Sequence, residues 1–223
     1  MGGIADNLRG VLAGLPEGVR LVAVSKFHPV EALLEAYGAG QRIFGENRAQ
    51  ELVAKSGQMP CDVEWHFIGH LQSNKVRQVA PVAALIHSCD SPELLRRVDS
   101  EARRAGRVAD VLLELHVAME ATKSGMTPDE CLRLADSGLL LGLPNVRVCG
   151  VMGMATLTDD TSRIRGEFRR IRATFEALKA GAMAGAAHFR EVSMGMSDDY
   201  PIAVDEGSTM VRIGTSIFGP REY

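Results

Sequence analysis

The sequence predicts a single (β/α)8 barrel of the TIM type, an α/β fold in which parallel strands alternate with helices. Eight runs rich in β-branched residues favour this fold, and the segments between them have helical spacing. The runs are also mainly apolar along their length, as expected for strands that are buried on both faces. A length of 223 residues is slightly under the usual size of such a barrel. We expect one domain over residues 1–223, and a doubly wound open sheet is the alternative.

The expected strands follow one another along the chain. They are RLVAVS (20–25), RIFG (42–45), VEWHFIG (63–69), ALIHS (84–88), ADVLLELHVA (109–118), VRVCGVMGM (146–154), FREVSM (189–194) and MVRIG (210–214).

Helix start signals lie between these strands. They are Pro29 before Val30, Asn47 before Leu52, Asn74 before Val76, Ser91-Pro92 before Leu94, Thr127-Pro128 before Leu132, and Thr161 at the start of a longer run. The stretch NLRGVLAGL (7–15) before the first strand also has helical spacing. We expect it to close the ring of helices that the short tail after the last strand leaves open.

The composition excludes some functions. A net charge of -3, from 25 basic and 28 acidic side chains, offers no basic field for a nucleic-acid backbone. Cys61, Cys89, Cys131 and Cys149 have no C-x-x-C spacing, which argues against a zinc site or a redox pair and favours buried, reduced thiols. The N-terminus has no signal-peptide core, and Asp6 stands where a myristoylation signal requires Ser or Thr. No run approaches the length of a membrane span, so we expect a cytoplasmic protein.

Two loops are the best candidates for binding an anion, because barrels often bind phosphate after strands seven and eight. After the seventh strand, SMGMSDDYPIAV offers the hydroxyls of Ser193 and Ser197, a close backbone approach at Gly195, and a helix start at SDD. After the eighth, RIGTSIFG offers Gly214 and the Thr215 hydroxyl. Each loop alone is compatible with an ordinary Gly-Ser turn, but together they favour a phosphate site.

Lys26 ends the first expected strand, in LVAVSKFHP, and therefore shares a mouth with those loops. Partial burial would lower the pKa of its amine and leave more of the neutral form that attacks aldehydes. An amine beside a phosphate site indicates a phosphorylated aldehyde, and pyridoxal 5'-phosphate fits that description. The alternative is a strand-end lysine whose charge reaches solvent.

Other polar residues near strand ends extend this site. Arg212 shares a strand face with Gly214, and its charge would keep a facing pyridine nitrogen unprotonated; a salt bridge at the rim is the alternative. Asn47 would bond a ring substituent of a cofactor or cap the next helix. His66 and His70, on a strand and its loop, do not form the helical pair of a metal site.

The motifs AVSKFHP, FGENRAQE, WHFIGHLQSNK, KSG and SMGMSDDYPIAVDEGSTMVRIGTSIFG resemble those of the pyridoxal phosphate homeostasis proteins. The barrel of that family is similar to the N-terminal domain of alanine racemase, which is fold type III among pyridoxal phosphate-binding proteins. The resemblance implies a monomer without the second, β domain of the racemases. It also implies cofactor binding without catalytic turnover and supply of the cofactor to apo-enzymes, with effects on amino-acid and keto-acid balance. The implied partners are pyridoxal phosphate, other B6 vitamers and apo-enzymes that require the cofactor.

The resemblance implies a role for each site residue. Lys26 would hold pyridoxal phosphate as a Schiff base. The phosphate would be held by Ser193, Gly195, Gly214 and Thr215. Arg212 would face the pyridine nitrogen, and Asn47 would lie beside the ring.

Two segments depart from the family pattern. His116, in LHVAMEATKSG, stands where relatives often have Asn, so a ring contact differs here if that Asn makes one. GVMGMATLTDD differs from relatives that have Cys or Thr after G-L-M, and it predicts a methionine-lined wall. Lys123, in KSG, has no assigned role.

A pyridoxal phosphate-dependent amino-acid racemase is the main alternative. Racemisation needs a base on each face of the substrate carbanion, and Lys26 supplies one of them. Racemases of this fold take the other, a tyrosine, from a partner's second domain, whereas the tyrosines here are Tyr37, Tyr200 and Tyr223. We therefore expect a non-catalytic binding protein. A regulatory protein that binds other proteins and carries the cofactor incidentally is a third possibility.

Overall fold

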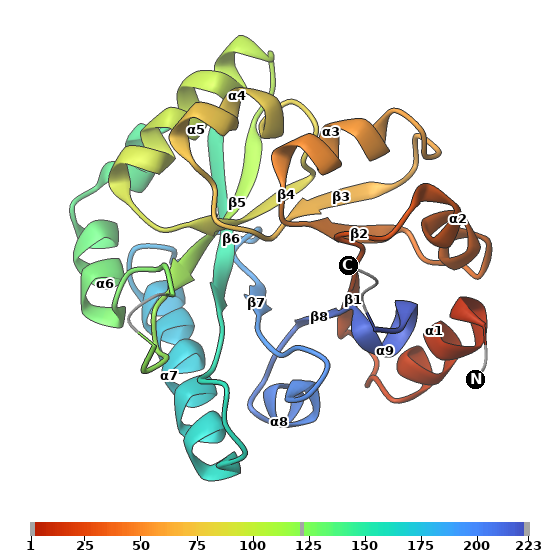
Figure 1. The fold of residues 1–223 in the computed structure, drawn as a ribbon. Helices are drawn as coiled ribbons and strands as arrows, with labels where there is room; N and C mark the ends of the chain where they lie inside the picture. Colours follow the sequence, from red (N-terminus) through yellow and green to blue (C-terminus); the bar gives the residue numbers. More distant parts are fainter. Residues whose placement is uncertain (1–2, 121–122, 221–223) are drawn as a thin grey trace.

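The computed structural model describes residues 3–120 and 123–220, and its strands form a closed parallel barrel surrounded by helices (Figure 1). The strands lie around the barrel in sequence order: β1 (Arg20–Val24), β2 (Ile43–Glu46), β3 (Glu64–Phe67), β4 (Leu85–Cys89), β5 (Ala109–Leu115), β6 (Val146–Gly153), β7 (Glu191–Ser193) and β8 (Met210–Ile213). β8 pairs with β1, with Leu21 opposite Val211, and this pairing closes the sheet. The predicted (β/α)8 barrel is confirmed, and the open-sheet alternative is wrong.

The helices cover the outside of the barrel. They are α1 (Ile4–Ala13), α2 (Val30–Gly38), α3 (Ala49–Ser56), α4 (Val76–Val79), α5 (Pro92–Arg104), α6 (Pro128–Asp136), α7 (Thr161–Ala180), α8 (Tyr200–Asp205) and α9 (Thr215–Phe218), with 3-10 turns η1 (Ser73–Lys75) and η2 (Leu139–Gly142). α1 lies beside both α9 and α2, so the helix before the first strand does close the ring (Figure 1).

Local start signals explain several of these helices. Ser91 accepts a hydrogen bond from the N–H of Leu94 at the start of α5, and Thr127 forms a reciprocal capping box with Glu130 at the start of α6. Asn74, expected as a start signal, lies inside η1 instead, because the chain tightens into a 3-10 turn before α4.

The barrel interior has an apolar layer of its own. Its members are Val22, Leu85, Leu112, Cys149, Met152 and Met210. Side chains alternate along a strand, so His66, Glu114 and Arg212, each two residues from a position on this interior face, point inward as well. The inside of the barrel is therefore apolar in part and polar toward the ends of its strands.

Two expectations about composition can be checked against the fold. Cys89, Cys131 and Cys149 are buried, but Cys61 is exposed, because it lies in the loop between α3 and β3 where no helix covers it. Within residues 3–120 and 123–220, no helix has the length and apolar character needed to cross a membrane. In the same ranges no group of three or more His, Cys, Asp or Glu side chains could hold a metal ion.

Candidate functional site

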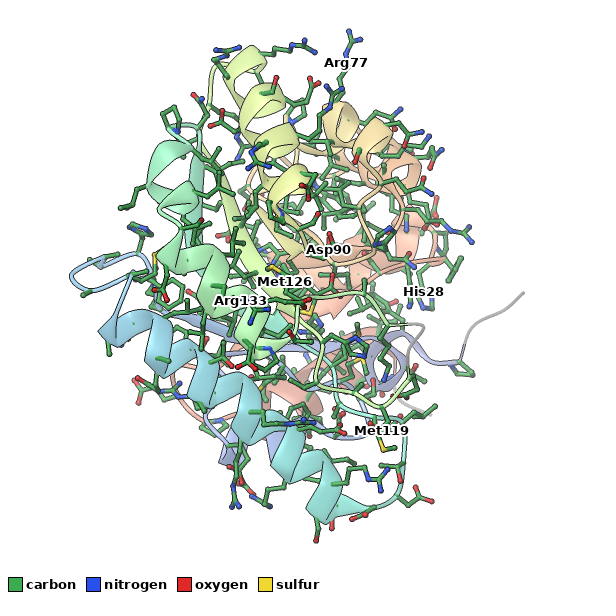
Figure 2. The ribbon with its side chains drawn as sticks, turned by 90° about the vertical axis from the view of Figure 1, so that its left-hand side faces the viewer. His28, Arg77, Asp90, Met119, Met126 and Arg133 are labelled. Carbon is green, nitrogen blue, oxygen red and sulfur yellow. The ribbon has the colours of Figure 1, made fainter. Side chains whose placement is uncertain are left out.

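The carboxyl ends of the strands surround a cavity of about 490 Å³. The described residues that line it are Val24, Lys26, His28, Asn47, Ile68, Gly69, His70, Glu114, Lys123, Ser124, Met154, Met196, Ser197, Asp198, Arg212, Gly214 and Thr215. Figure 2 shows the barrel from the side. His28, which lines the cavity, lies toward the same end of the molecule as Met119 in the loop after β5. Five of the seven predicted site residues line the cavity: Lys26, Asn47, Arg212, Gly214 and Thr215.

Lys26 follows β1 in a tight turn, in which the His28 N–H donates to the Ser25 carbonyl at 3.1 Å. The imidazole of His28 stacks on the ring of Phe218 in α9, with centroids 4.9 Å apart. The turn therefore packs against the helix that follows β8. This packing brings Lys26 and the loop after β8 to the same cavity, which Lys26, Gly214 and Thr215 all line.

Arg212 is buried at the floor of the cavity and is held by neutral groups. Its Nη1 donates to the carbonyl of Ser193 at 2.9 Å and to Ser193 Oγ at 2.7 Å, and its Nη2 donates to the Gly153 carbonyl at 3.1 Å. Burial lowers the pKa of Arg212 to about 10, although the Asp199 and Glu114 carboxylates oppose that shift. The guanidinium is thus still charged at neutral pH. The guanidinium is buried and bonded to neutral groups in the described part of the chain, so the alternative of a salt bridge at the rim is wrong.

Ser193 does not line the cavity. It is fully buried, and its Oγ lies 3.1 Å from His87 Nδ1, whose ring in turn places Nε2 3.0 Å from His66 Nδ1. Arg212 is a donor only, so the Ser193 hydroxyl accepts from Arg212 and directs its own proton to His87. This polar chain runs from the cavity floor into the barrel interior and fixes the position of the guanidinium.

Both histidines of this chain are neutral. Burial lowers the pKa of His66 to about 3 and also lowers the pKa of His87, with a further contribution from the nearby positive charges. The guanidinium of Arg212 is therefore the charged member of this hydrogen-bonded chain of side chains, and Arg212 lines the cavity.

Two glycines shape the loops after β7 and β8. Gly195 has φ +94°, and a Cβ there would lie 2.6 Å from the Cβ of Ala203 in α8, so the loop can pack on α8 only with glycine. Gly214 has an ordinary φ, but a Cβ there would lie 3.0 Å from the Val24 carbonyl oxygen of β1. Gly214 and Thr215 themselves line the cavity, whereas Gly195 does not, although Met196 and Ser197 of the same loop do.

Asn47 follows β2 and lines the cavity. The alternative role as a helix cap is wrong, because α3 begins at Ala49 after Arg48 and has no side-chain cap. The Oδ1 atom of Asn47 is buried and has no hydrogen-bond partner in the described part of the chain. A buried acceptor without a partner at a cavity wall suits a donor on a bound molecule.

Glu114 is a cavity residue that sequence reasoning missed. It is buried, its Oε1 accepts from the Ser124 hydroxyl at 3.0 Å, and its Oε2 has no partner among the described atoms. Burial raises the pKa of Glu114 to about 7, with Ser124 and Arg212 opposing the shift and Asp90 adding to it. The signal was present as a lone acid in the apolar run VLLEL, but that run did not show which face the acid occupies.

The structure also places the residues that departed from the family pattern. His116 is half-buried outside the cavity lining, and its backbone N–H donates to the Met126 carbonyl at 2.8 Å. Lys123 lines the cavity and donates to Glu120 at 2.9 Å and to the Ala155 carbonyl at 2.7 Å. Of the methionines, Met154 and Met196 line the cavity, while Met152 packs inside the barrel.

His66 and His70 have different surroundings. His66 is buried in the polar chain, whereas His70 lines the cavity, largely exposed, with its Nδ1 3.5 Å from the Asp90 carboxylate. Neither histidine belongs to a metal-binding group among the residues that the structure describes.

Comparison with known proteins gives a consistent set of similarities. The model of the alanine racemase N-terminal domain family matches residues 1–222. The pyridoxal phosphate homeostasis protein of Vibrio alginolyticus is 41% identical over 216 residues, covering 93% of this chain and 89% of that one.

Solved structures agree with the sequence comparison. PipY of Synechococcus elongatus PCC7942, 39% identical, superposes with a TM-score of 0.90 without PLP and 0.87 with PLP bound; each match covers 97% of this chain and 100% of PipY. Alanine racemase of Clostridium difficile 630 shares the fold with a TM-score of 0.77 at 14% identity, and the match covers 56% of the racemase chain.

Proposed function

The chain belongs to the pyridoxal phosphate homeostasis proteins, within the alanine racemase N-terminal domain family, and from this premise we propose that its barrel-mouth cavity binds pyridoxal 5'-phosphate. One observation carries the proposal. Lys26, Arg212, Gly214 and Thr215, which come from opposite ends of the sequence, line one cavity together with Asn47.

The residues present fit this cofactor. The Asn47 Oδ1, which has no partner among the described residues, supplies an acceptor at the wall, and the absence of a Cβ at Gly214 lets the loop after β8 pack directly against Val24 of β1. Hydroxyls of Ser197 and Thr215 line the same cavity and can donate to an anion. When bound, pyridoxal phosphate supplies an electrophilic aldehyde and a phosphate group.

The protein groups have separable tasks. Lys26 Nζ, as the neutral amine, would form the C=N bond of a Schiff base to the aldehyde carbon, and its two N–H protons would leave with the aldehyde oxygen as water. Thr215, Gly214 and Ser197 would bind the phosphate. Arg212 would face the pyridine nitrogen, and its fixed positive charge would disfavour protonation there.

Ser193 and Gly195 were predicted from the motifs to hold the phosphate. In this proposal they would act indirectly, through residues that line the cavity. Ser193 would orient Arg212, to which it is bonded. Gly195 would let the loop that carries Ser197 pack on α8.

The proposed role is handling of the free cofactor. We propose that residues 1–223 act as one binding domain, as a monomer in the cytoplasm, which sequesters the aldehyde and supplies it to apo-enzymes. We propose no catalytic turnover. The described tyrosines support this, because Tyr37 donates to Asp62 on the outer surface and Tyr200 packs near Gly14, away from the cavity lining. Tyr223, the third tyrosine, lies outside the described residues.

The first experiment is reconstitution of the purified protein with pyridoxal phosphate, followed by borohydride reduction and peptide mass mapping. The expected result is a visible absorption band and a reduced adduct on Lys26, both absent from Lys26→Ala. Lys179→Ala, which removes an exposed lysine of α7, is the control for unspecific labelling. A protein that takes up no cofactor, or carries the adduct elsewhere, would contradict the proposal. Turnover of an amino acid at a rate that vanishes in Lys26→Ala would contradict the non-catalytic role.

A further inference from the structure

The turn that carries Lys26 has an unusual backbone. Lys26 and Phe27 are its two central residues, between Ser25 and His28, and Phe27 adopts φ +67°. A left-handed conformation is costly for a bulky residue without a polar side chain, and Phe27 is the one non-glycine residue with positive φ in the described chain. Such a conformation persists only where surrounding contacts fix it.

Three charged side chains next to this turn form what we call the Lys55 cluster: Glu46 at the end of β2, and Glu51 and Lys55 on α3. Lys55 Nζ lies 2.8 Å from Glu46 Oε1 and 3.1 Å from Glu51 Oε2. Glu46 is fully buried and Lys55 is nearly so. Charges this deeply buried are expensive unless their partners are placed with good geometry.

The remaining bonds of the Lys55 cluster end on the turn itself. Lys55 Nζ donates to the Ser25 carbonyl at 2.9 Å, and the Ser25 hydroxyl donates to Glu46 Oε1 at 2.6 Å. On the other side of Lys26, the Phe27 N–H donates to Glu51 Oε2 at 2.9 Å. The residues immediately before and after Lys26 are thus both held by one buried group of charges.

Lys55 is a second lysine beside this turn, and its contacts assign it a different task from that of Lys26. An ammonium has three N–H donors, and Lys55 directs them at three acceptors: the Ser25 carbonyl, Glu46 and Glu51. An amine whose hydrogen bonds are directed at three acceptors in this way is engaged, so it does not compete for an aldehyde.

We propose that the Lys55 cluster is a positioning device for Lys26, which fixes the left-handed turn and thereby directs the Lys26 amine into the cavity. The inference rests on the proposed function, because it assigns Lys26 the role of the reacting amine. Glu51 is the member best suited to a test. It is partly exposed on a helix, where alanine is tolerated, and its carboxylate accepts a hydrogen bond from the Phe27 N–H.

The test compares Glu51→Ala with Glu51→Gln. Both variants remove the carboxylate charge, but glutamine keeps an acceptor oxygen for the Phe27 N–H and alanine does not. The measurement is the rate at which a borohydride-trapped adduct forms on Lys26 with pyridoxal phosphate, across a pH series, alongside the melting temperature. Glu176→Ala is the matched control, since Glu176 pairs with Arg172 at the same i,i+4 spacing on α7.

The expected result is adduct formation about tenfold slower in Glu51→Ala at every pH, with substantial recovery in Glu51→Gln and wild-type behaviour in Glu176→Ala. An equal rate in wild type and Glu51→Ala would overturn the inference and leave the proposed function intact. An equal loss in the Ala and Gln variants would also overturn it, since the lost charge and not the clamp on Phe27 would then be the cause. A wild-type protein that forms no adduct on Lys26 would overturn the proposed function and this inference together.

Discussion

Two cations are buried among the residues that the structure describes, one on each side of the sheet, and they have opposite kinds of partner. Lys55 lies between α3 and the outer face of the sheet, where two carboxylates lie within 3.1 Å of its ammonium. Arg212 lies inside the barrel, where its guanidinium is bonded to a hydroxyl and to backbone carbonyls. Both side chains are almost inaccessible to solvent.

The difference in partners matches a difference in task. A cation neutralised by carboxylates has little field left for a ligand, but its bonds fix the geometry of the groups around it. A cation held by neutral dipoles keeps its charge available to whatever enters the cavity, because no counter-ion cancels it. The Lys55 cluster is therefore suited to holding backbone in place, and Arg212 to acting on a bound molecule.

The largest expected effect comes from breaking the neutralised pair. Lys55→Met leaves Glu46 buried without its cation, and we expect this to lower the free energy of unfolding by about 3–5 kcal/mol. For a protein of this size, that corresponds to a fall in melting temperature of about 6–20 °C. Calorimetry on the wild type and the variant measures it.

The matched control for this change is Lys55→Met combined with Glu46→Gln. The burial that already raises the pKa of Glu46 would no longer act on a charge, so the double variant should recover part of the loss. A double variant as unstable as Lys55→Met alone would show that Lys55 acts through its bonds to the turn and not through Glu46.

This comparison also shows how far the sequence alone could go. The strand and helix patterns predicted the barrel because each element carries its own local signal, and the barrel geometry then brought the strand ends together. Lys26, Asn47, Arg212, Gly214 and Thr215 were predictable as neighbours for that reason. Their meeting at one cavity follows from topology.

The contacts that depend on side-chain packing were not predictable. Glu114 lies in a strand that is apolar on both faces, so alternation could not assign its direction. Ser193 was predicted as an anion ligand, but its side chain points below the cavity floor, toward His87. The Lys55 cluster joins a helix to two strand ends, and no local pattern marks a contact of that kind.

Glu114 allows a test inside the barrel, on the side of the sheet where Arg212 is bonded to neutral groups. Its pKa is raised to about 7, mainly by burial, so the folded state holds a proton that the unfolded state releases at lower pH. Its contribution to stability is therefore complete below the unfolded pKa and is lost as pH rises through about 7. Glu114→Gln, which is neutral at all pH values, should gain on the wild type by up to about 3 kcal/mol over that window.

Denaturant unfolding at a series of pH values from acidic to mildly alkaline measures this difference. Glu93→Gln, at an exposed position on α5, is the control for loss of a carboxylate without burial. A difference between the wild type and Glu114→Gln that does not change with pH would show that the carboxyl titrates alike in both states.

Ser193→Ala tests the neutral partners of Arg212. The substitution removes the hydroxyl that accepts from Arg212 and that bonds His87, so we expect a loss of about 1–3 kcal/mol in stability. Ser197→Ala, at the cavity wall, is the matched control and should leave stability nearly unchanged while weakening binding of pyridoxal phosphate. If Ser193→Ala left stability unchanged and weakened phosphate binding instead, the hydroxyl would serve the ligand directly.

The smallest expected effect belongs to an ion pair that water can reach. Arg147 and Asp110 face each other across β5 and β6 with two bonds of 2.7 and 2.6 Å, both shorter than the two ion pairs of Lys55, but the Arg147 side chain is 52% exposed. Asp110→Asn should cost only about 0.2–1 kcal/mol, and salt should reduce that cost further, because solvent screens the pair. Unfolding at low and high ionic strength measures both effects. A cost as large as that of Lys55→Met would mean that hydrogen-bond geometry, and not burial, determines how much an ion pair such as Lys55–Glu46 or Arg147–Asp110 contributes to stability.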